Sequence, residues 1–214
     1  MFARGSALGG SLWRFALSEV NKAEIRKALR AKLASITEPQ RHQKSIAACG
    51  HLIRTPEFKA ARTVMLYLST PTEVETAPLA LRCWQEGKTV VVPKVSWDQR
   101  RMLPVEINSL QTEGITTTGP GIREPIAGKP IPTEYIDLVV VPGLGFTPTG
   151  HRIGRGMGFY DRFLAQADFS GLSCGLAFAE QIIDSLPVLA HDMPLGMLVT
   201  DQSVRRFTPN LIKS

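Results

Sequence analysis

A glycine-rich stretch that follows an apolar run constrains this chain more than any other feature. Residues 138–141 (LVVV) are apolar, and residues 142–164 (PGLGFTPTGHRIGRGMGFYDRFL) follow them directly. The last three glycines alternate and lead into residues 159–167 (FYDRFLAQA), which are typical of a helix start. Glycine lets the backbone approach a ligand closely and adopt positive φ, and a helix start offers unpaired N–H groups. The order strand, glycine loop, helix therefore predicts a phosphate-binding site.

Charged side chains interleaved with these glycines support this interpretation. Arg152 and Arg155 add positive charge, and Asp161 lies one turn into the expected helix, where its carboxylate could hold a magnesium ion that bridges phosphate oxygens. The alternative is a structural loop whose glycines merely allow tight turns. The loop is neither of the two common nucleotide loops, because it lacks a G-K-[ST] ending and has Phe159 where a third glycine is needed.

Length and composition bound the class of protein. A chain of 214 residues fits one generous domain or two small ones, and no apolar run is long enough to span a bilayer, so we expect no membrane partner. The three cysteines are scattered without metal-type spacing, which favours a reducing compartment with buried thiols. A net charge of +6 favours anionic ligands and would also suit nucleic acid. Because no lysine/arginine run or RNP-type aromatic pattern is present, we expect no nucleic-acid partner.

The first 18 residues differ from the rest of the chain. Residues 1–18 hold two arginines, three serines and no acidic residue, a composition compatible with a mitochondrial or plastid transit peptide. The alternatives are a short disordered extension or an upstream start codon in a bacterial gene. We expect a flexible N-terminal extension over residues 1–18, a single domain over residues 19–214, and a cytoplasmic protein, with a mitochondrial location as the alternative.

Helical and strand patterns alternate along the remaining chain. We expect helices over residues 20–35, 37–53 and 77–86, and strands over residues 63–69, 88–93, 137–141, 172–178 and 197–200. The strands are nearly all apolar, which indicates a mostly parallel sheet covered on both faces and hence an α/β fold. Residues 94–136 are irregular, and we expect hairpins or a flap over the site there.

The glycine-rich stretch resembles the signature of the 5-formyltetrahydrofolate cyclo-ligases, also called methenyltetrahydrofolate synthetases. That signature runs P-G-x-x-F and then G-x-R-x-G-x-G-x-G-[YF]-Y-D, and the resemblance extends over roughly residues 20–202. The matching residues are Pro142, Gly143, Phe146, Gly150, Arg152, Gly154, Gly156, Gly158, Phe159, Tyr160 and Asp161. The resemblance implies a three-layer α/β unit with a mostly parallel sheet, of the kind shared with ribose-5-phosphate isomerase and CoA transferases.

The resemblance also implies an activity. The family closes 5-formyltetrahydrofolate to 5,10-methenyltetrahydrofolate with ATP and magnesium, and releases ADP and phosphate. Phosphoryl transfer to the formyl oxygen gives an iminium phosphate, N10 attacks the activated carbon, and phosphate leaves. Positioned cations and backbone N–H groups lower the barrier of such a transfer. No strong general base is evident in the sequence, and the reaction needs none.

Lys22 and Arg26 lie four residues apart on the expected first helix. By spacing alone, a solvated basic face is the commoner interpretation, but the resemblance implies that both reach the ATP phosphates. It implies catalytic roles for Arg155 and Tyr160, although Tyr160 could equally be a packed aromatic. The ATP contacts that it implies are Lys22, Arg26, Arg152, Gly154, Arg155, Gly156, Met157, Gly158 and Tyr160.

The segment YLSTPTEVET follows the first expected strand, where parallel sheets bind ligands. The resemblance implies that Glu75 contacts the reduced pterin and that Thr70 is a neighbouring contact; the alternative for Glu73 or Glu75 is an acidic residue in the first turn of a helix. The implied folate contacts are Thr70, Glu75, Arg155, Gly156, Met157, Gly158 and Phe159. Asp161 and Asp192 match the family's acidic positions, and two carboxylates with phosphate oxygens make an ordinary magnesium site.

Three positions depart from the family pattern: Met157 where lysine or glycine is common, Phe159 in place of a tyrosine, and Thr147 where aspartate is frequent. These changes concern substrate affinity more than reaction type. Two other functions remain open, a non-catalytic nucleotide- or RNA-binding module on the same fold and a sugar-phosphate isomerase that needs no ATP. We expect a monomer whose partner is the small-molecule substrate.

Overall fold

The computed structural model describes residues 9–118 and 121–207 of the chain. The helices are α1 (Gly9–Ala34), α2 (Glu38–Ile53), α3 (Pro56–Ala60), α4 (Ala77–Gln85) and α5 (Phe159–Leu164), with 3₁₀ turns η1 (Thr112–Gly114), η2 (Thr133–Tyr135) and η3 (Ala179–Gln181). The strands are β1 (Thr63–Met65), β2 (Thr89–Ser96), β3 (Arg101–Glu106), β4 (Ile115–Thr118), β5 (Ile122–Pro125), β6 (Leu138–Val141), β7 (Gly145–Phe146), β8 (Arg152–Ile153), β9 (Leu172–Ala177), β10 (Met197–Thr200) and β11 (Val204–Arg206). None of the helices described combines the length and the apolar character that a bilayer crossing requires.

The central sheet has seven strands in the order β11-β10-β9-β6-β1-β2-β3. Its five inner strands pair in parallel, while β3 and β11 pair antiparallel at the two edges. All five strands expected from the apolar runs are present and form this parallel centre. The sheet is therefore mixed but mostly parallel, as the apolar character of the runs indicated.

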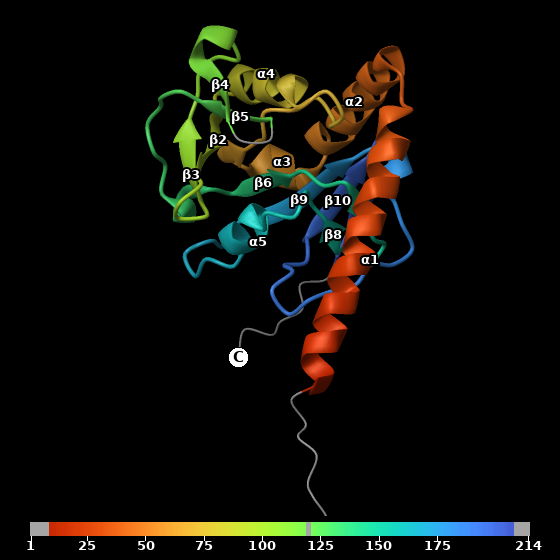
Figure 1. Ribbon diagram of the computed structural model, residues 1–214. Helices are drawn as coiled ribbons and strands as arrows, with labels where there is room; N and C mark the ends of the chain where they lie inside the picture. Colours follow the sequence, from red (N-terminus) through yellow and green to blue (C-terminus); the bar gives the residue numbers. More distant parts are fainter. Residues whose placement is uncertain (1–8, 119–120, 208–214) are drawn as a thin grey trace, which may run out of the picture.

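Helices cover both faces of the sheet, and each face carries its own core (Figure 1). Val64 and Val140 pack on the face that carries Leu29 of α1, Leu52 of α2 and Leu79 of α4. The neighbouring strand positions Met65 and Val139 point to the other face, which packs against Phe163 of α5. This alternation follows from the pleat of a strand, and it confirms the α/β class in a layered arrangement.

The helix boundaries follow from local chemistry with one exception. At the start of α2, the Gln40 side chain accepts a hydrogen bond from the Thr37 backbone N–H at 3.0 Å, as the expected capping box requires. Gly87 has a φ of +68° and ends the α4 segment. Thr76 precedes α4 as expected, but its hydroxyl donates to the Tyr67 carbonyl oxygen at 2.6 Å and does not cap the helix. It thereby fastens the chain after β1 to the start of α4.

The structure differs from the expectations in four places. Helix α1 begins at Gly9, so part of the expected extension is helical, while residues 1–8 lie outside the described residues. Helix α3 and the edge strand β11 were not expected. Residues 94–136, expected as hairpins or a flap, form β3 and the β4–β5 hairpin. The short β7–β8 hairpin interrupts the glycine-rich stretch between β6 and α5.

Gly171 lies where the chain entering β9 packs closely against the chain entering β6. A Cβ at this position would overlap the backbone carbonyl oxygens of Ile136 and Asp137, whereas a Cβ at Gly114 would meet no atom within 4 Å. We expect Gly171→Ala to lower the free energy of unfolding by about 1–3 kcal/mol, as overpacked positions do, and Gly114→Ala to leave it nearly unchanged. Urea unfolding followed by circular dichroism measures both, and equal midpoints would contradict the role assigned to Gly171.

Candidate active site

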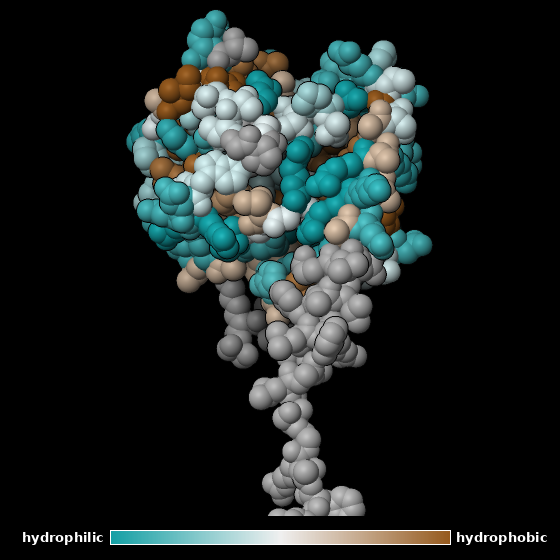
Figure 2. Space-filling model, viewed as in Figure 1, coloured by the Kyte–Doolittle hydropathy of each residue, from teal (hydrophilic) through white to brown (hydrophobic). Residues whose placement is uncertain are grey.

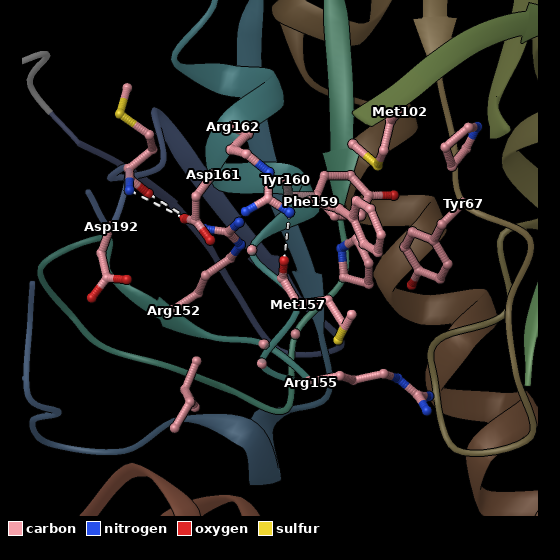
Figure 3. A pocket seen from close by; sticks show the side chains of 18 of the residues that line it. Tyr67, Met102, Arg152, Arg155, Met157, Phe159, Tyr160, Asp161, Arg162 and Asp192 are labelled. Atoms are coloured by element: carbon pink, nitrogen blue, oxygen red, sulfur yellow. Dashed lines mark hydrogen bonds and ion pairs between the residues drawn. The ribbon is translucent and has the colours of Figure 1, made fainter. Parts of the chain in front are cut away.

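A pocket of about 700 Å³ opens beyond the carboxyl ends of β1, β2 and β6. Its walls come from α1, the segment after β1, strands β2, β3 and β5, the glycine loop with α5, and residues 190–193. In Figure 3, Asp161, Arg152 and Asp192 lie toward one side of the pocket and Tyr67 and Met102 toward the other. The pocket thus has a charged end and an end lined by rings and apolar side chains, at the place where parallel sheets bind ligands.

The glycine loop reaches the pocket through two positive-φ turns. Gly156 has a φ of +107° and Gly158 a φ of +64°, values that side chains other than glycine rarely adopt. Phe159 then turns into the core and meets Trp97 edge to face, with 5.4 Å between ring centroids. The loop is therefore held between two glycine turns and a buried aromatic anchor.

Positive charge dominates the pocket. Seven basic side chains line it, namely Lys22, Arg26, Arg100, Arg123, Arg152, Arg155 and Arg162. Three carboxylates line it, those of Glu73, Asp161 and Asp192. Hydrophilic residues also gather on the face between α1 and the β4–β5 hairpin (Figure 2). Such an excess of cations in one cavity suits a polyanionic ligand.

Each of the three carboxylates is paired with one of the pocket's own cations. Lys22 Nζ lies 2.8 Å from Asp192 Oδ2, and Arg152 Nη1 lies 2.8 Å from Asp161 Oδ1. Arg155 Nη2 lies 3.1 Å from Glu73 Oε1 and also donates to Thr70 Oγ1 at 2.8 Å. Because burial strengthens such contacts, these pairs fix where the loop and α1 sit.

Asp192 remains ionised in this setting. Burial alone raises the pKa of its carboxyl, but hydrogen bonds from Lys22 and from the Leu189 backbone N–H outweigh burial and lower the pKa below the ordinary value. Its second oxygen, Oδ1, lies 3.9 Å from His191 Nε2. The carboxylate is therefore negatively charged at neutral pH and faces the pocket.

The hydroxyl of Tyr160 is buried and has no hydrogen-bond partner among the described residues. Burial, followed by the negative charge of Glu73, raises the pKa of Tyr160 well above its ordinary value, against the opposing effect of Arg152. The hydroxyl therefore stays protonated and can donate. A buried donor without a partner is costly, and Tyr160 lines the pocket, so a ligand could satisfy it.

The other end of the pocket is apolar. Pro93 and Val95 of β2 and Met102 of β3 form one wall, with Leu68 and Phe159 beside them. The expected flap region thus contributes a wall built from the β2–β3 hairpin. Flat apolar walls of this kind suit a ring system.

The structure brings all predicted site residues but one to this pocket. Those that line it are Lys22, Arg26, Thr70, Arg152, Gly154, Arg155, Gly156, Met157, Gly158, Phe159, Tyr160, Asp161 and Asp192. Glu75 does not line it: its Oε2 lies 2.8 Å from His42 Nδ1 of α2, and its backbone N–H donates to Ser45 Oγ. Glu73, two residues earlier, faces the pocket instead.

Four charged residues that line the pocket were not predicted as site residues from the sequence: Glu73, Arg100, Arg123 and Arg162. Glu73 was placed with Glu75 at the end of the first expected strand, but only Glu75 was chosen as a folate contact, because the family resemblance matched it. Arg162 lies one helical turn after Gly158, a spacing that could have indicated it. Arg100 and Arg123 lie in the region without periodic pattern, which gave no signal for either.

The pocket offers few donor atoms for a metal ion. Within the described residues, no group of three or more histidine, cysteine or acidic side chains is arranged to hold an ion. Asp161 and Asp192 both line the pocket, and carboxylate oxygens are the ligands that magnesium prefers. Magnesium usually keeps several waters and takes only one or two carboxylates together with substrate phosphates. The donor set therefore fits magnesium bound with a polyphosphate.

Comparison with known proteins places the chain. Residues 18–201 match the model of the 5-formyltetrahydrofolate cyclo-ligase family. The 5-formyltetrahydrofolate cyclo-ligase of Mus musculus is 28% identical over 195 residues, which cover 86% of this chain and 96% of the mouse protein. That of Escherichia coli K12 is 28% identical over 179 residues, covering 82% and 98% of the two chains. The NMR structure of the Aquifex aeolicus 5,10-methenyltetrahydrofolate synthetase matches with a TM-score of 0.74 and 34% identity, covering 86% and 92%. The chain therefore belongs to the 5-formyltetrahydrofolate cyclo-ligase family.

Proposed function

We propose that the protein converts 5-formyltetrahydrofolate to 5,10-methenyltetrahydrofolate with ATP and magnesium, and releases ADP and phosphate. One observation carries this proposal: a single pocket joins a cation-rich glycine loop with two acidic residues to an apolar wall. The first part suits a metal-bound triphosphate and the second a pterin ring. The relatives named above support the same reaction.

The charged end acts on the transferring phosphoryl group. When bound there, magnesium would be held by Asp161 and Asp192 and would neutralise charge on the phosphates. Lys22, Arg26 and Arg155 stabilise the charge that develops as the phosphoryl group moves to the formyl oxygen. Arg152, which is buried, holds Asp161 in place at 2.8 Å. Backbone N–H groups of residues 154–158 complete the phosphate contacts.

The other end orients the folate so that N10 can attack the carbon of the formyl group once its oxygen carries the phosphoryl group. Glu73 accepts hydrogen bonds from pterin N–H groups, in the role that the family resemblance gave to Glu75. Tyr160 donates its free hydroxyl to the folate or the transferred phosphate. Thr70, Gly156, Met157, Gly158 and Phe159 shape the boundary between the two ligands. No residue has to act as a strong base, because phosphate itself is the leaving group.

Several finer features belong to the same proposal. The parallel sheet between two helical layers is consistent with the ribose-5-phosphate isomerase and CoA transferase type of fold. We further propose residues 1–18 as an extension to a single domain over residues 19–214, a monomer that works on small molecules and binds no nucleic acid, and a cytoplasmic location with a mitochondrial one as the alternative.

A spectrophotometric assay tests the reaction. The folded protein is mixed with 5-formyltetrahydrofolate, ATP and magnesium, and methenyltetrahydrofolate is followed by its near-ultraviolet absorbance. We expect a signal that requires ATP. Its absence from folded protein would favour a non-catalytic nucleotide- or RNA-binding module, and a change of substrate without ATP would favour an isomerase.

The two neighbouring glutamates offer a matched pair of variants. Glu73→Gln should raise the KM for folate about tenfold or more, because a charge-assisted hydrogen bond contributes roughly 1.5–3 kcal/mol. Glu75→Gln, outside the pocket, should leave the KM nearly unchanged. Steady-state kinetics with folate varied at saturating ATP measures both. A larger effect of Glu75→Gln would return the pterin contact to Glu75.

Tyr160→Phe should separate stability from activity. The hydroxyl has no protein partner, so its loss should leave the free energy of unfolding unchanged or raise it by about 1 kcal/mol, while kcat/KM falls roughly threefold to tenfold. Tyr67→Phe is the control, because the Tyr67 hydroxyl donates to the Val74 carbonyl oxygen at 2.9 Å. That variant should lower the free energy of unfolding by about 1–2 kcal/mol. Chemical unfolding and steady-state kinetics of both variants measure these effects. A lower free energy of unfolding for Tyr160→Phe would contradict the role of its hydroxyl as a ligand donor.

A further inference from the structure

Lys22 forms an ion pair with Asp192, one of the two acidic residues assigned to magnesium. Its ammonium lies 2.8 Å from Asp192 Oδ2, and the side chains of Lys22 and Asp192 are only 6% and 14% exposed. Among the described contacts, the ammonium has no other hydrogen-bond partner. The same oxygen of Asp192 also accepts the Leu189 backbone N–H at 2.8 Å, which fixes the carboxylate in its loop.

In this contact, Lys22 would compete with a metal ion for the Asp192 carboxylate. An ammonium has three donors and no acceptor, so Lys22 cannot itself become a ligand of the metal. A divalent ion next to Asp192 would meet the Lys22 charge at close range in a poorly solvated place, where like charges repel strongly. It would also enter a pocket whose basic side chains already outnumber its carboxylates. A phosphate group, in contrast, offers the ammonium another acceptor.

The second ion pair of the metal site is built differently. Arg152 also donates to the Met193 carbonyl oxygen at 3.4 Å, and Asp161 also accepts the Met193 backbone N–H at 3.2 Å. The planar guanidinium of arginine is held rigidly by its several hydrogen-bond partners, whereas the lysine ammonium is a point charge on a flexible side chain. The Arg152–Asp161 pair therefore stays in place when ligands bind, and the Lys22–Asp192 pair is the one that can exchange.

We propose that Lys22 is a positioning residue that withholds Asp192 from the metal until a nucleotide phosphate draws its ammonium away; this rests on the proposed function, which assigns Asp192 to magnesium. Magnesium alone then binds weakly to the free protein. Binding of the polyphosphate frees Asp192, and by thermodynamic linkage each ligand strengthens the binding of the other.

Manganese titration of the nucleotide-free, full-length protein tests this proposal, with free Mn²⁺ followed by electron paramagnetic resonance. Lys22→Gln should bind Mn²⁺ about tenfold or more tightly than the wild type, a factor typical of coupled sites. The glutamine amide can still donate to Asp192, so the variant should fold; Lys22→Met is the second variant, and circular dichroism checks both. Adding Asp192→Asn to Lys22→Gln should abolish the gain.

Arg26→Gln is the matched control. Arg26 lies one turn further along α1 and lines the same pocket, but its Nε donates to the Gly154 carbonyl oxygen at 3.1 Å and not to a carboxylate. This variant loses the same charge and should gain little Mn²⁺ affinity. An equal gain would show that net charge alone controls the metal.

One other result would overturn the proposal: Lys22 variants that bind Mn²⁺ no more tightly than the wild type. The absorbance assay on the wild type is independent of these titrations. If the assay shows ATP-dependent product while the titrations fail, the withholding role is wrong and the proposed function stands. If the assay itself fails, the proposed function falls whatever the titrations show.

Discussion

The pairing of pocket carboxylates with pocket cations is the interaction on which the site depends. Helix α1, the loop after β1, the glycine loop and the segment before β10 are far apart in sequence. The Lys22–Asp192 pair joins α1 to the segment before β10, and the Arg155–Glu73 pair joins the glycine loop to the loop after β1. The Arg152–Asp161 pair lies within the glycine-rich stretch itself. Half-buried pairs of this kind contribute little net stability, because desolvation offsets their attraction. Their effect is positional: they hold acidic and basic side chains around one cavity before any ligand arrives.

The parallel sheet determines where these loops can meet. Strands β1 and β6 are buried on both faces and pair in parallel, so the segments that follow them leave the sheet at one edge. The apolar strands carry no chemistry, and the residues beyond them carry nearly all of it. Gly156 and Gly158 adopt positive φ there without the clash that a Cβ would cause, while the rigid sheet and the buried Phe159 hold the loop at both ends.

The sequence predicted the elements that are strongly apolar and missed those that are short or polar. The five central strands are continuous apolar runs, and each was found, although β1 ends at Met65 and not at residue 69, and β2 extends three residues past its expected end. Strand β3 alternates exposed and buried residues and contains Pro104, and β7 and β8 have two residues each, too few for any period to be visible. Their pairing partners, which no local pattern contains, make them strands.

The same limit explains the two glutamates. Glu73 and Glu75 have the same residue type, lie two positions apart and follow the same strand, so neither spacing nor charge distinguishes them. Contacts from other parts of the chain determine which of the two side chains points into the pocket. The Glu73 side chain accepts the Thr70 backbone N–H at 2.9 Å and thereby turns toward Arg155, whereas Ser45 and His42 of α2 take the backbone N–H and the side chain of Glu75. Helix α2 thus selects which acid faces the pocket, although it contributes no residue to the pocket wall.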